Sequence, residues 1–292
     1  MDIIAFLCFV EILDLRKQLI HQLKPKFSDR EAKYLVDLLM EETLDIKKSK
    51  LLINHSLVVD ESKVCLLESY INRLLEEEPI QYILEGEYFY GLPFKVNKNV
   101  LIPRPETEEL VEWIIEESMN YPSLKILDIG TGSGCIPIAL KLNLPASNVT
   151  AIDVSHEALI VANENANLLN ASVHFQQVDI LDETTWADFD KFDIIVSNPP
   201  YIPHKENALM EGNVLKFEPA LALFVADKNP LIFYEKIRQF ALQKLQPEGA
   251  LFFECNEYNA KQVKKLLENH FKEVTLKKDI NQKDRMVMGR KF

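Results

Sequence analysis

The stretch that decides the fold is residues 125–134, which read KILDIGTGSG. A short apolar run leads directly into a loop with three glycines, and a helical pattern follows over residues 136–144. A strand, a tight glycine turn and a helix in this order predict one βα unit. Glycines let the backbone of such a turn approach a ligand closely, and the N-terminus of the following helix favours a carboxylate or phosphate. We therefore expect a ligand-binding loop here.

The spacing of the glycines narrows the choice of ligand. The dinucleotide fingerprint needs glycine at the first, third and sixth loop positions. Here glycines stand at the first, third and fifth positions, and Cys135 occupies the sixth. This spacing argues against a nicotinamide cofactor and is typical of the loop that binds the methionine part of S-adenosyl-L-methionine, the alternative being a βα turn without a ligand. The predicted cofactor-binding residues of the loop are Gly130, Thr131, Gly132, Ser133 and Gly134.

Two further strand ends carry acidic residues. The second apolar strand ends in Asp153, which lies 23 positions after Gly130, the interval of one βαβ unit. An acid at this place can accept both hydroxyls of an adenosine ribose, although a lone strand-end aspartate is more often a helix cap. Asp179 and Ile180 follow the third expected strand and would lie near the adenine. Asp179 could accept from the adenine amino group or cap a helix.

A proline-rich turn follows the apolar run 192–197: residues 198–201 read NPPY. The residue before a proline is held in an extended conformation, and each proline fixes its own φ and lacks an N–H. The turn is therefore stiff and offers acceptors but few donors. The Asn198 side-chain oxygen and the Pro199 carbonyl could accept both hydrogens of one planar amide or exocyclic amine. The turn thus indicates group transfer onto a planar nitrogen, unless it is simply a turn after a buried strand.

Strands and helices alternate from residue 125 onward, which predicts an α/β fold with a mostly parallel seven-stranded sheet and helices on both faces. No long helix separates the last two strands, so we expect them to form an antiparallel hairpin at the sheet edge. Ligands of such sheets bind at the carboxyl ends of the strands, where Gly130, Asp153 and Asn198 all lie. The expected strands are 125–130, 149–153, 172–178, 192–197, 250–255, 274–280 and 285–290, and the expected helices are 136–144, 156–169, 231–245 and 260–270.

The first 78 residues show a helical pattern and no convincing strand. An amphipathic helix is expected over 12–23. The apolar run 3–10 is flanked by acidic residues and is too short to span a bilayer, so we interpret it as neither a signal peptide nor a membrane anchor. We expect a helical domain over 1–78, a connector over 79–109 and a catalytic domain over 110–292. Two apolar helix faces are expected in the first domain, made of Tyr34, Leu35, Leu38 and Leu39 and of Leu66, Leu67, Tyr70 and Leu74.

Composition and charge set the broad class of protein. The chain has 292 residues, of which 47% are hydrophobic, and this suits one or two globular domains. The formal net charge of −12 lowers the expectation of a nucleic-acid partner, which would need a basic face. We expect no metal site, because the histidines form no H-E-x-x-H motif. We also expect no membrane partner. Free thiols in a reducing, cytoplasmic compartment are expected for Cys8, Cys65, Cys135 and Cys255.

The glycine loop, the strand-end acid and the NPPY turn together resemble a class I S-adenosylmethionine-dependent methyltransferase with a Rossmann-like fold. Two further segments narrow the resemblance: residues 79–94 read PIQYILEGEYFYGLPF and residues 101–109 read LIPRPETEE. They resemble the connector of the HemK/PrmC family, the glutamine methyltransferases of peptide chain release factors. The resemblance runs from Pro79 to the end of the chain and includes KFEP at 216–219 and DRMV at 284–287.

The resemblance implies a specific reaction. S-adenosyl-L-methionine would methylate the side-chain amide nitrogen of the glutamine in the Gly-Gly-Gln motif of class 1 release factors, which act in translation termination. Asn198, which would also lie against the cofactor, and Pro199 would be the catalytic residues that hold the amide plane. The N-terminal helical domain would help to grip the protein substrate. The substrate-binding residues would be Asn198, Pro199, Pro200, Tyr201, Leu101 and Arg104.

Several individual roles stay open at the level of sequence. Tyr201 would pack its ring against the glutamine stem or belong to the core. The segment 101–106 would close the pocket from the connector side. Arg104 would bind a carboxylate of the cofactor or of a neighbouring glutamate, or be an exposed linker charge. Asp128 would orient the glycine loop, and Glu218 has no assigned role.

Two rival function classes stay open as well. A nucleic-acid amine methyltransferase could use the same turn on adenine or guanine but would need a base-flipping pocket and a basic groove. The acidic N-terminal region and the connector segment argue against it. A non-catalytic module that only binds S-adenosylmethionine is the second rival, and the intact Asn198, Pro199 and Pro200 argue against that one.

Overall fold

The chain divides into two compact units, residues 1–85 and 86–292. The boundary lies inside the segment 79–109 that we expected to be a connector, and the three-part division made from the sequence stays a prediction. Most of the apolar run 3–10 lies outside the described residues. The structure is a computed structural model that describes residues 10–47, 49–50, 57–121, 123–203 and 212–292.

The first unit is built on the helices α1 (Ile12–Leu23), α2 (Asp29–Leu44) and α4 (Glu61–Leu75), followed by the short α5 (Ile80–Ile83). Helix α1 has the bounds expected from the sequence. Apolar residues three and four positions apart give each long helix one apolar face. These faces meet in a single core, whose buried members include Leu15, Leu19, Leu39, Leu67 and Ile71.

The structure differs from the expectations for this unit in two details. Strand β1 (Val10–Glu11) pairs antiparallel with β2 (Val58–Val59), a ladder too short to stand out in the sequence pattern. Tyr34 and Leu66, which we expected on apolar faces, are 59% and 41% exposed. Both expectations were wrong because the buried face of α2 runs through Ala32, Leu35, Val36 and Leu39, and that of α4 through Leu67, Ile71 and Leu74.

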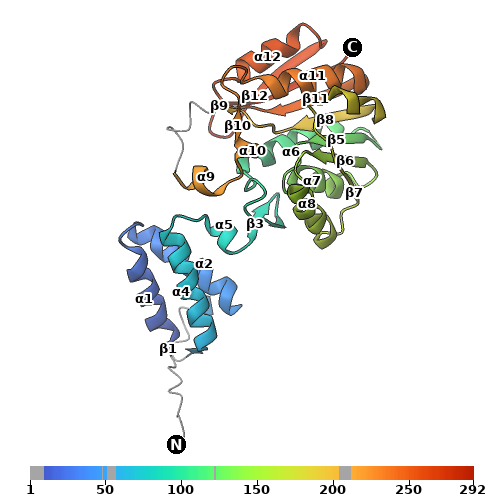
Figure 1. The fold of residues 1–292 in the computed structure, drawn as a ribbon. Coiled ribbons are helices and arrows are strands. Elements are labelled where there is room, and N and C mark those ends of the chain that lie inside the picture. The colour runs from blue at the N-terminus through green and yellow to red at the C-terminus, as the bar shows by residue number, and fades with distance from the viewer. Residues whose placement is uncertain (1–9, 48, 51–56, 122, 204–211) are drawn as a thin grey trace, which may run out of the picture. The chain divides into compact units, whose positions relative to one another are not determined.

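The second unit is centred on a seven-stranded sheet. Its strands are β5 (Lys125–Ile129), β6 (Asn148–Asp153), β7 (Val173–Gln177), β8 (Phe192–Ser197), β11 (Leu245–Glu254), β12 (Glu273–Lys278) and β13 (Asp284–Arg290). Their order across the sheet is β12-β13-β11-β8-β5-β6-β7 (Figure 1). Strands β7, β6, β5, β8 and β11 pair in parallel, whereas β13 is antiparallel to both of its neighbours. The predicted mostly parallel sheet with a hairpin at one edge is confirmed.

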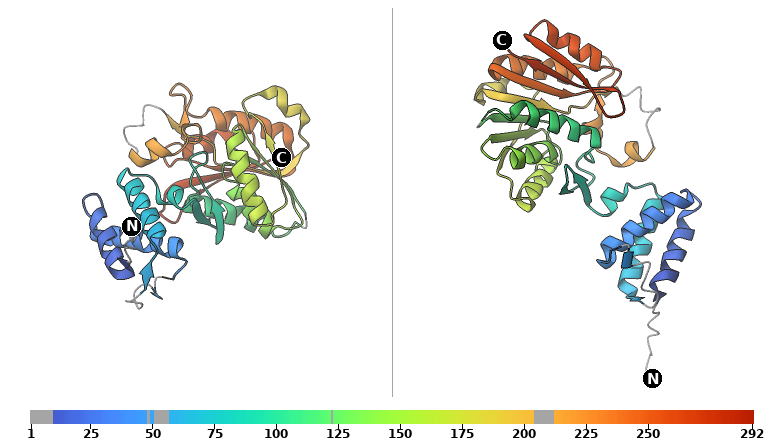
Figure 2. Two further views of the ribbon diagram at one scale, coloured as in Figure 1. Left: turned by 60° about the horizontal axis from the view of Figure 1, so that its bottom comes forward. Right: turned by 180° about the vertical axis from the view of Figure 1, so that it is seen from behind.

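Side chains that alternate along the strands pack in two separate hydrophobic cores, one on each face of the sheet. In β8, Ile194 and Val196 belong to the core on one face, whereas Ile195 belongs to the core on the other. This alternation follows from the pleat, because successive side chains point to opposite faces. Helices cover both faces (Figure 2). One face carries α6 (Pro105–Ser118), α7 (Cys135–Asn143) and α8 (His156–Leu168), and the other carries α11 (Ile232–Lys244) and α12 (Ala260–Glu268).

Shorter elements connect the main ones. They are β3 (Gly86–Phe89), β4 (Leu92–Lys95), the 3₁₀ helix η1 (Glu183–Asp188), β9 (Ile202–Pro203), α9 (Gly212–Phe217), α10 (Ala220–Leu223) and β10 (Phe224–Val225). Strands β3 and β4 form an antiparallel hairpin before α6, and β9 pairs in parallel with β10. In the part of the chain that the structure describes, no helix has the length and apolar character needed to span a bilayer.

The strand order changes direction between β5 and β8. Strands β6 and β7 lie on one side of β5, whereas β8 and β11 lie on the other. In open α/β sheets ligands bind beside such a switch point, at the carboxyl ends of the strands. The topology alone therefore points to the ends of β5 and β8 as the place for a site.

Candidate active site

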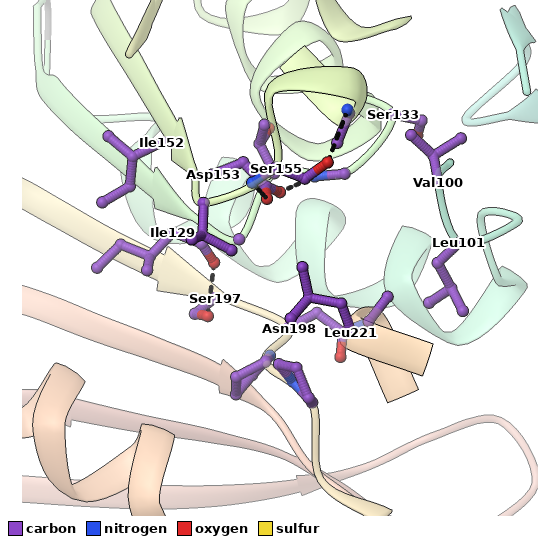
Figure 3. Close-up of a pocket in the computed structure, with 18 of the residues that line it drawn as sticks. Val100, Leu101, Ile129, Ser133, Ile152, Asp153, Ser155, Ser197, Asn198 and Leu221 are labelled. Carbon is purple, nitrogen blue, oxygen red and sulfur yellow. Dashed lines mark hydrogen bonds between the residues drawn. The ribbon is translucent and has the colours of Figure 1, made fainter. Parts of the chain in front are cut away.

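A cavity of about 170 Å³ opens at the carboxyl ends of β5, β6, β7 and β8 (Figure 3). Opposite the glycine loop it is bounded by the turn that follows β8. Val100 and Leu101, from the segment before α6, line another side. The structure thus brings most of the predicted site residues together. Those that line the cavity are Leu101, Arg104, Gly130, Thr131, Gly132, Ser133, Asp153, Asp179, Ile180, Asn198, Pro199 and Pro200.

The conformation of the loop explains its last glycine. Gly134 is the N-cap of α7 and has a φ of 80°, a value that residues with a Cβ rarely adopt. A Cβ at this position would also lie 3.1 Å from the Cβ of Ala162 on α8. Gly134 is therefore needed for the close approach of the loop to α8, whereas Gly130, Thr131, Gly132 and Ser133 line the cavity itself.

A buried amide on α8 holds the loop from behind. Asn165 has no exposed surface, and its Nδ2 donates to the Ser133 carbonyl at 2.9 Å and to the Lys95 carbonyl at 3.0 Å. Its Oδ1 accepts from the Lys95 N–H at 2.7 Å. Asn165 thereby links β4 to the glycine loop. Sequence reasoning missed it, and a polar residue within the apolar face of the expected helix 156–169 was its only signal.

Asp153 organises the loop as well as lining the cavity. One carboxylate oxygen accepts from the Gly132 N–H and the other from the Ser155 N–H, both at 2.9 Å. The cap of α8 is Ser155, whose hydroxyl accepts from the Ala158 N–H, so Asp153 is not the helix cap. Burial raises the pKa of Asp153, and the backbone donors partly oppose this. Because a carboxylate has about four acceptor sites, Asp153 keeps capacity for further donors.

Asp128 lies in β5, just ahead of the glycine loop. It has no exposed surface, and neither carboxylate oxygen makes a hydrogen bond of ordinary geometry with the described residues, although the nearby Thr131 hydroxyl acts to lower its pKa. Burial raises its pKa to about 7. Removing a carboxylate from water is costly, so positive charge close to Asp128 would stabilise its ionised form.

The turn after β8 is anchored to the neighbouring strand. The Ser197 hydroxyl donates to the Ile129 carbonyl of β5 at 2.7 Å, which fixes the end of β8 beside the glycine loop (Figure 3). Pro199 is buried, whereas Asn198 and Pro200 are half-buried, and all three line the cavity. The stiff acceptor-rich turn expected from the sequence therefore faces the same space as the loop.

Behind Asn198 stands a buried polar pair that sequence reasoning missed. Thr107, in the first turn of α6, donates its hydroxyl hydrogen to Glu254 Oε2 at 2.6 Å. The Asn198 Nδ2 lies 3.4 Å from the Thr107 hydroxyl oxygen. Thr107 and Glu254 are each 3% exposed. Burial raises the pKa of Glu254 to about 7. Nothing in the order of the residues along the chain connects these three side chains.

Arg104 forms an ion pair with a neighbouring glutamate, which was one of the alternatives left open by the sequence. Its Nη2 lies 2.5 Å from Glu218 Oε1, and the Glu218 side chain is only 2% exposed. The other oxygen of Glu218 has no hydrogen-bond partner among the described residues. Glu218, which had no predicted role, thus anchors the segment before α6 to the chain just ahead of α10.

Two predicted residues have contacts beyond the cavity. Asp179 lines the cavity, but its Oδ1 also accepts from the Leu181 N–H at 2.8 Å, within a local turn. Tyr201 is half-buried and packs against the core on the α11 face, where burial raises the pKa of its hydroxyl. Tyr201 is not among the cavity-lining residues, and its contact with a substrate stays a prediction.

In the described part of the chain, no group of three or more His, Cys, Asp or Glu side chains is arranged to hold a metal ion. Three of the four cysteines lie in this part and are free thiols. Cys65 is exposed, whereas Cys135 and Cys255 are buried, and burial raises the pKa of the Cys135 thiol to about 12. A thiol of this kind is a poor nucleophile, so the chemistry of the site rests on other groups.

Comparison with known proteins agrees with both units. A family model described as the PrmC N-terminal domain matches residues 14–84, and one described as the methyltransferase small domain matches residues 107–216. A release factor glutamine methyltransferase from Flavobacterium psychrophilum is 46% identical over 94% of this chain and 98% of its own length. A protein of the same name from Bacteroides thetaiotaomicron is 41% identical over 89% of this chain and 93% of its own length.

A solved methyltransferase from Pyrococcus furiosus matches with a TM-score of 0.50, at 18% identity, over 76% of this chain and 98% of that one. That likeness concerns the fold alone and agrees with the class I methyltransferase fold predicted from the sequence. The much higher identity to the two bacterial relatives, over nearly their whole length, confirms the narrower resemblance. The chain belongs to the release factor glutamine methyltransferase family.

Proposed function

We propose that this chain transfers the methyl group of S-adenosyl-L-methionine to the side-chain amide nitrogen of the glutamine in the Gly-Gly-Gln motif of a class 1 peptide chain release factor. The observation that carries the proposal is that the Asn198–Pro200 turn and the glycine loop line one cavity. A methyl donor and a planar nitrogen can react only if both reach the same space. The names of the relatives support the choice of glutamine and of release factors as the substrate.

The residues around the glycine loop fit S-adenosyl-L-methionine. Asp153 keeps acceptor capacity for the ribose hydroxyls, and Val154 and Ile180 provide apolar surface for the adenine. The buried carboxyl of Asp128, which lies just ahead of the glycine loop, would be stabilised in its ionised form by the positive charge of a bound cofactor. When bound, S-adenosyl-L-methionine supplies an electrophilic methyl group on a positively charged sulfur.

The turn after β8 would hold the acceptor. An amide nitrogen is a poor nucleophile because its lone pair is delocalised into the carbonyl. The Asn198 Oδ1 and the Pro199 carbonyl would accept its two N–H groups, fix its plane and raise the electron density on nitrogen. Orientation of this kind supplies effective molarities of about 10⁵–10⁸ M, and fixed dipoles stabilise the positive charge that develops on nitrogen. The nitrogen loses its proton after methylation, so no general base is needed before attack.

The first unit would contribute to recognition of the protein substrate. Residues 14–84 match a family model described as the PrmC N-terminal domain. This match supports a role for the first unit in the methylation reaction proposed for this family. Deleting residues 1–78 should lower methylation of a release factor far more than it lowers affinity for S-adenosyl-L-methionine. A truncated enzyme with an unchanged rate on the release factor would remove this part of the proposal.

The function is tested by offering the enzyme methyl-labelled S-adenosyl-L-methionine together with a folded release factor, duplex DNA and ribosomal RNA in parallel. Label should enter only the release factor, and peptide mass spectrometry should locate it on the glutamine of the Gly-Gly-Gln motif. A release factor with glutamate in place of that glutamine is the matched control and should take up no label. Label in either nucleic acid, with none in the protein, would overturn the proposal in favour of a nucleic-acid amine methyltransferase.

A further inference from the structure

We propose that Thr107 and Glu254 are positioning residues that fix which end of the Asn198 side-chain amide faces the cavity. The inference rests on the proposed function, because it concerns how the acceptor amide of the substrate is held. It assigns a role to two buried polar residues that belong neither to the glycine loop nor to the NPPY turn.

The three side chains come from separate elements that meet at the wall of the cavity, which Thr107 and Asn198 line. Thr107 lies in the first turn of α6, Glu254 is the last residue of β11, and Asn198 follows β8. Thr107 is 147 positions from Glu254 and 91 positions from Asn198 in the sequence. The Thr107–Glu254 hydrogen bond is short, at 2.6 Å, and buried, whereas the Asn198–Thr107 contact is longer, at 3.4 Å. Hydrogen bonds of catalytic groups are often long before substrate is bound and tighten in the complex.

The direction of each hydrogen bond follows from the chemistry of the groups. An ionised carboxylate can only accept, so Glu254 takes the single hydroxyl hydrogen of Thr107. The Thr107 oxygen is then left with lone pairs only and must accept from its next neighbour. Only the NH₂ end of Asn198 can donate to it. The Asn198 Oδ1 is therefore turned away from Thr107 and is left to accept from a substrate.

The orientation matters because the two ends of an amide have nearly the same shape and opposite hydrogen-bonding character. If Asn198 were rotated by half a turn, it would present NH₂ to the NH₂ group of a glutamine. Two donors would face each other, and the substrate amide would lose one of the two acceptors that hold its plane. The Thr107–Glu254 pair thus selects, of two amide orientations with nearly the same shape, the one in which the Asn198 Oδ1 faces the substrate as an acceptor.

The same logic predicts a dependence on the protonation of Glu254. A protonated Glu254 could donate to the Thr107 oxygen, and the Thr107 hydrogen would then be free to donate to Asn198 Oδ1, which favours the reversed amide. Burial raises the pKa of Glu254 to about 7, whereas the Thr107 hydrogen bond, the charge of Arg285 on β13 and the NH₂ end of Asn198, which also faces the carboxylate, act against this. Turnover should therefore fall as the pH drops below neutrality. The other charged or titratable groups that face Glu254 are Glu106 on α6, Cys135 on α7, Tyr201 after β8, Tyr234 on α11 and Cys255.

The decisive variant is Thr107→Val, which removes the hydroxyl and keeps the branched shape. We expect single-turnover methyl transfer to a release factor to fall about 10–100-fold, because a small misplacement of a reacting group can cost up to about 10²-fold in rate. Affinity for S-adenosyl-L-methionine should change little by comparison, whereas the melting temperature should fall, because Glu254 loses a buried hydrogen-bond donor. Thr107→Ser keeps the hydroxyl and should restore the rate to within about threefold of wild type. Ser118→Ala is the matched control, because it removes another buried hydroxyl from α6 whose bond stays within the helix.

A double-mutant cycle separates positioning from general stability. If Thr107 acts through Asn198, then Thr107→Val should add almost no further loss of rate to Asn198→Ala, because the group that it orients is already gone. Independent, multiplicative losses would overturn the proposal. A Thr107→Val enzyme with the wild-type rate would also overturn the proposal. In either case, methylation of the release factor by the wild-type enzyme would leave the proposed function intact.

Glu254→Gln provides a second route if Thr107→Val does not fold. A glutamine amide can donate to the Thr107 oxygen, so the variant should lose turnover, and the rate that it retains should not fall toward acidic pH as the wild-type rate does. A Glu254→Gln enzyme with both the rate and the pH profile of wild type would overturn the proposal. If the wild-type enzyme does not methylate any release factor, the proposed function itself is wrong, and the role of Thr107, which rests on it, falls with it.

Discussion

The two halves of the cavity are built in different ways. The half around the glycine loop is shaped mainly by contacts between neighbouring βα units, such as the bond from the Gly132 N–H to Asp153, which spans 21 positions, and Asn165 adds one longer link to Lys95 across 70 positions. The half around Asn198 depends on side chains that lie far apart in the chain. Thr107 bonds Glu254 across 147 positions, and Arg104 pairs with Glu218 across 114.

This difference shows which part of an active site a single sequence can reveal. The donor half is encoded by motifs whose backbone geometry is local, because a turn with glycine at fixed positions specifies its own shape. The acceptor half has one local motif, the NPPY turn, and a support that exists only once β8, β11 and α6 have assembled. The two halves should therefore respond differently to substitution, and each change below tests that separation.

The largest expected effect is the loss of turnover in Asn198→Ala. The variant removes one of the two acceptors that hold the substrate amide, and such a loss typically lowers the rate about 10²–10³-fold. Affinity for S-adenosyl-L-methionine should change far less than the rate, because the glycine loop and Asp153, rather than the expected contact with Asn198, would supply most of its binding. Asn198→Asp is the sharper companion, because the added charge could tighten cofactor binding while turnover still falls. Single-turnover methyl transfer at saturating cofactor measures both variants, and an Asn198→Ala rate within about threefold of wild type would contradict the account.

Asp153→Ala should act on the other half. Loss of the carboxylate leaves the Gly132 N–H and the ribose hydroxyls without an acceptor, which should weaken binding of S-adenosyl-L-methionine by about 1–3 kcal/mol. Turnover at saturating cofactor should recover most of the wild-type rate. Calorimetric titration with the cofactor measures the effect. Unchanged affinity would show that Asp153 serves the loop turn only.

Much of the fold and of the donor half could be predicted from the sequence, and the exceptions have physical causes. Strand β11 begins at Leu245 rather than at the expected residue 250, because Pro247 and Gly249 interrupt the apolar run while pairing with β8 continues across a register shift. Asn165, Thr107 and Glu254 were missed because a buried polar residue is recognisable only through its partner. The partners of these three residues lie on other elements.

A smaller expected effect is a loss of stability in Gly134→Ala, which distinguishes backbone strain from side-chain crowding in the glycine loop. Gly134→Ala should lower the free energy of unfolding by about 1–3 kcal/mol, because its φ is 80° and its new Cβ would crowd Ala162. Gly91→Ala is the matched control, since Gly91 has a φ of 72° but nothing within 4 Å of the added Cβ. Urea denaturation should show the greater loss for Gly134→Ala. Equal losses would mean that the contact with α8 contributes nothing.

The smallest expected effect is a dependence of stability on pH. Asp128 and Glu254 both have a pKa of about 7 in the folded protein, above their ordinary values of 3.8 and 4.5. The folded state then binds more protons than the unfolded state over this range, so the free energy of unfolding should fall as the pH rises through 7, on the order of 1 kcal/mol for each group. Asp128→Asn and Glu254→Gln should each flatten the profile measured by urea denaturation. Stability that rises between about pH 6 and pH 8, in wild type and in both variants alike, would refute the assignment.

The most direct test of the account compares Asn198→Ala with Asp153→Ala in one experiment that yields two numbers for each enzyme. The numbers are the Kd for S-adenosyl-L-methionine and the single-turnover rate of release factor methylation at saturating cofactor. The account predicts a crossed result: Asn198→Ala keeps the Kd and loses the rate, whereas Asp153→Ala weakens the Kd and keeps most of the rate. Parallel losses of both numbers in both variants would contradict a site made of separate donor and acceptor halves.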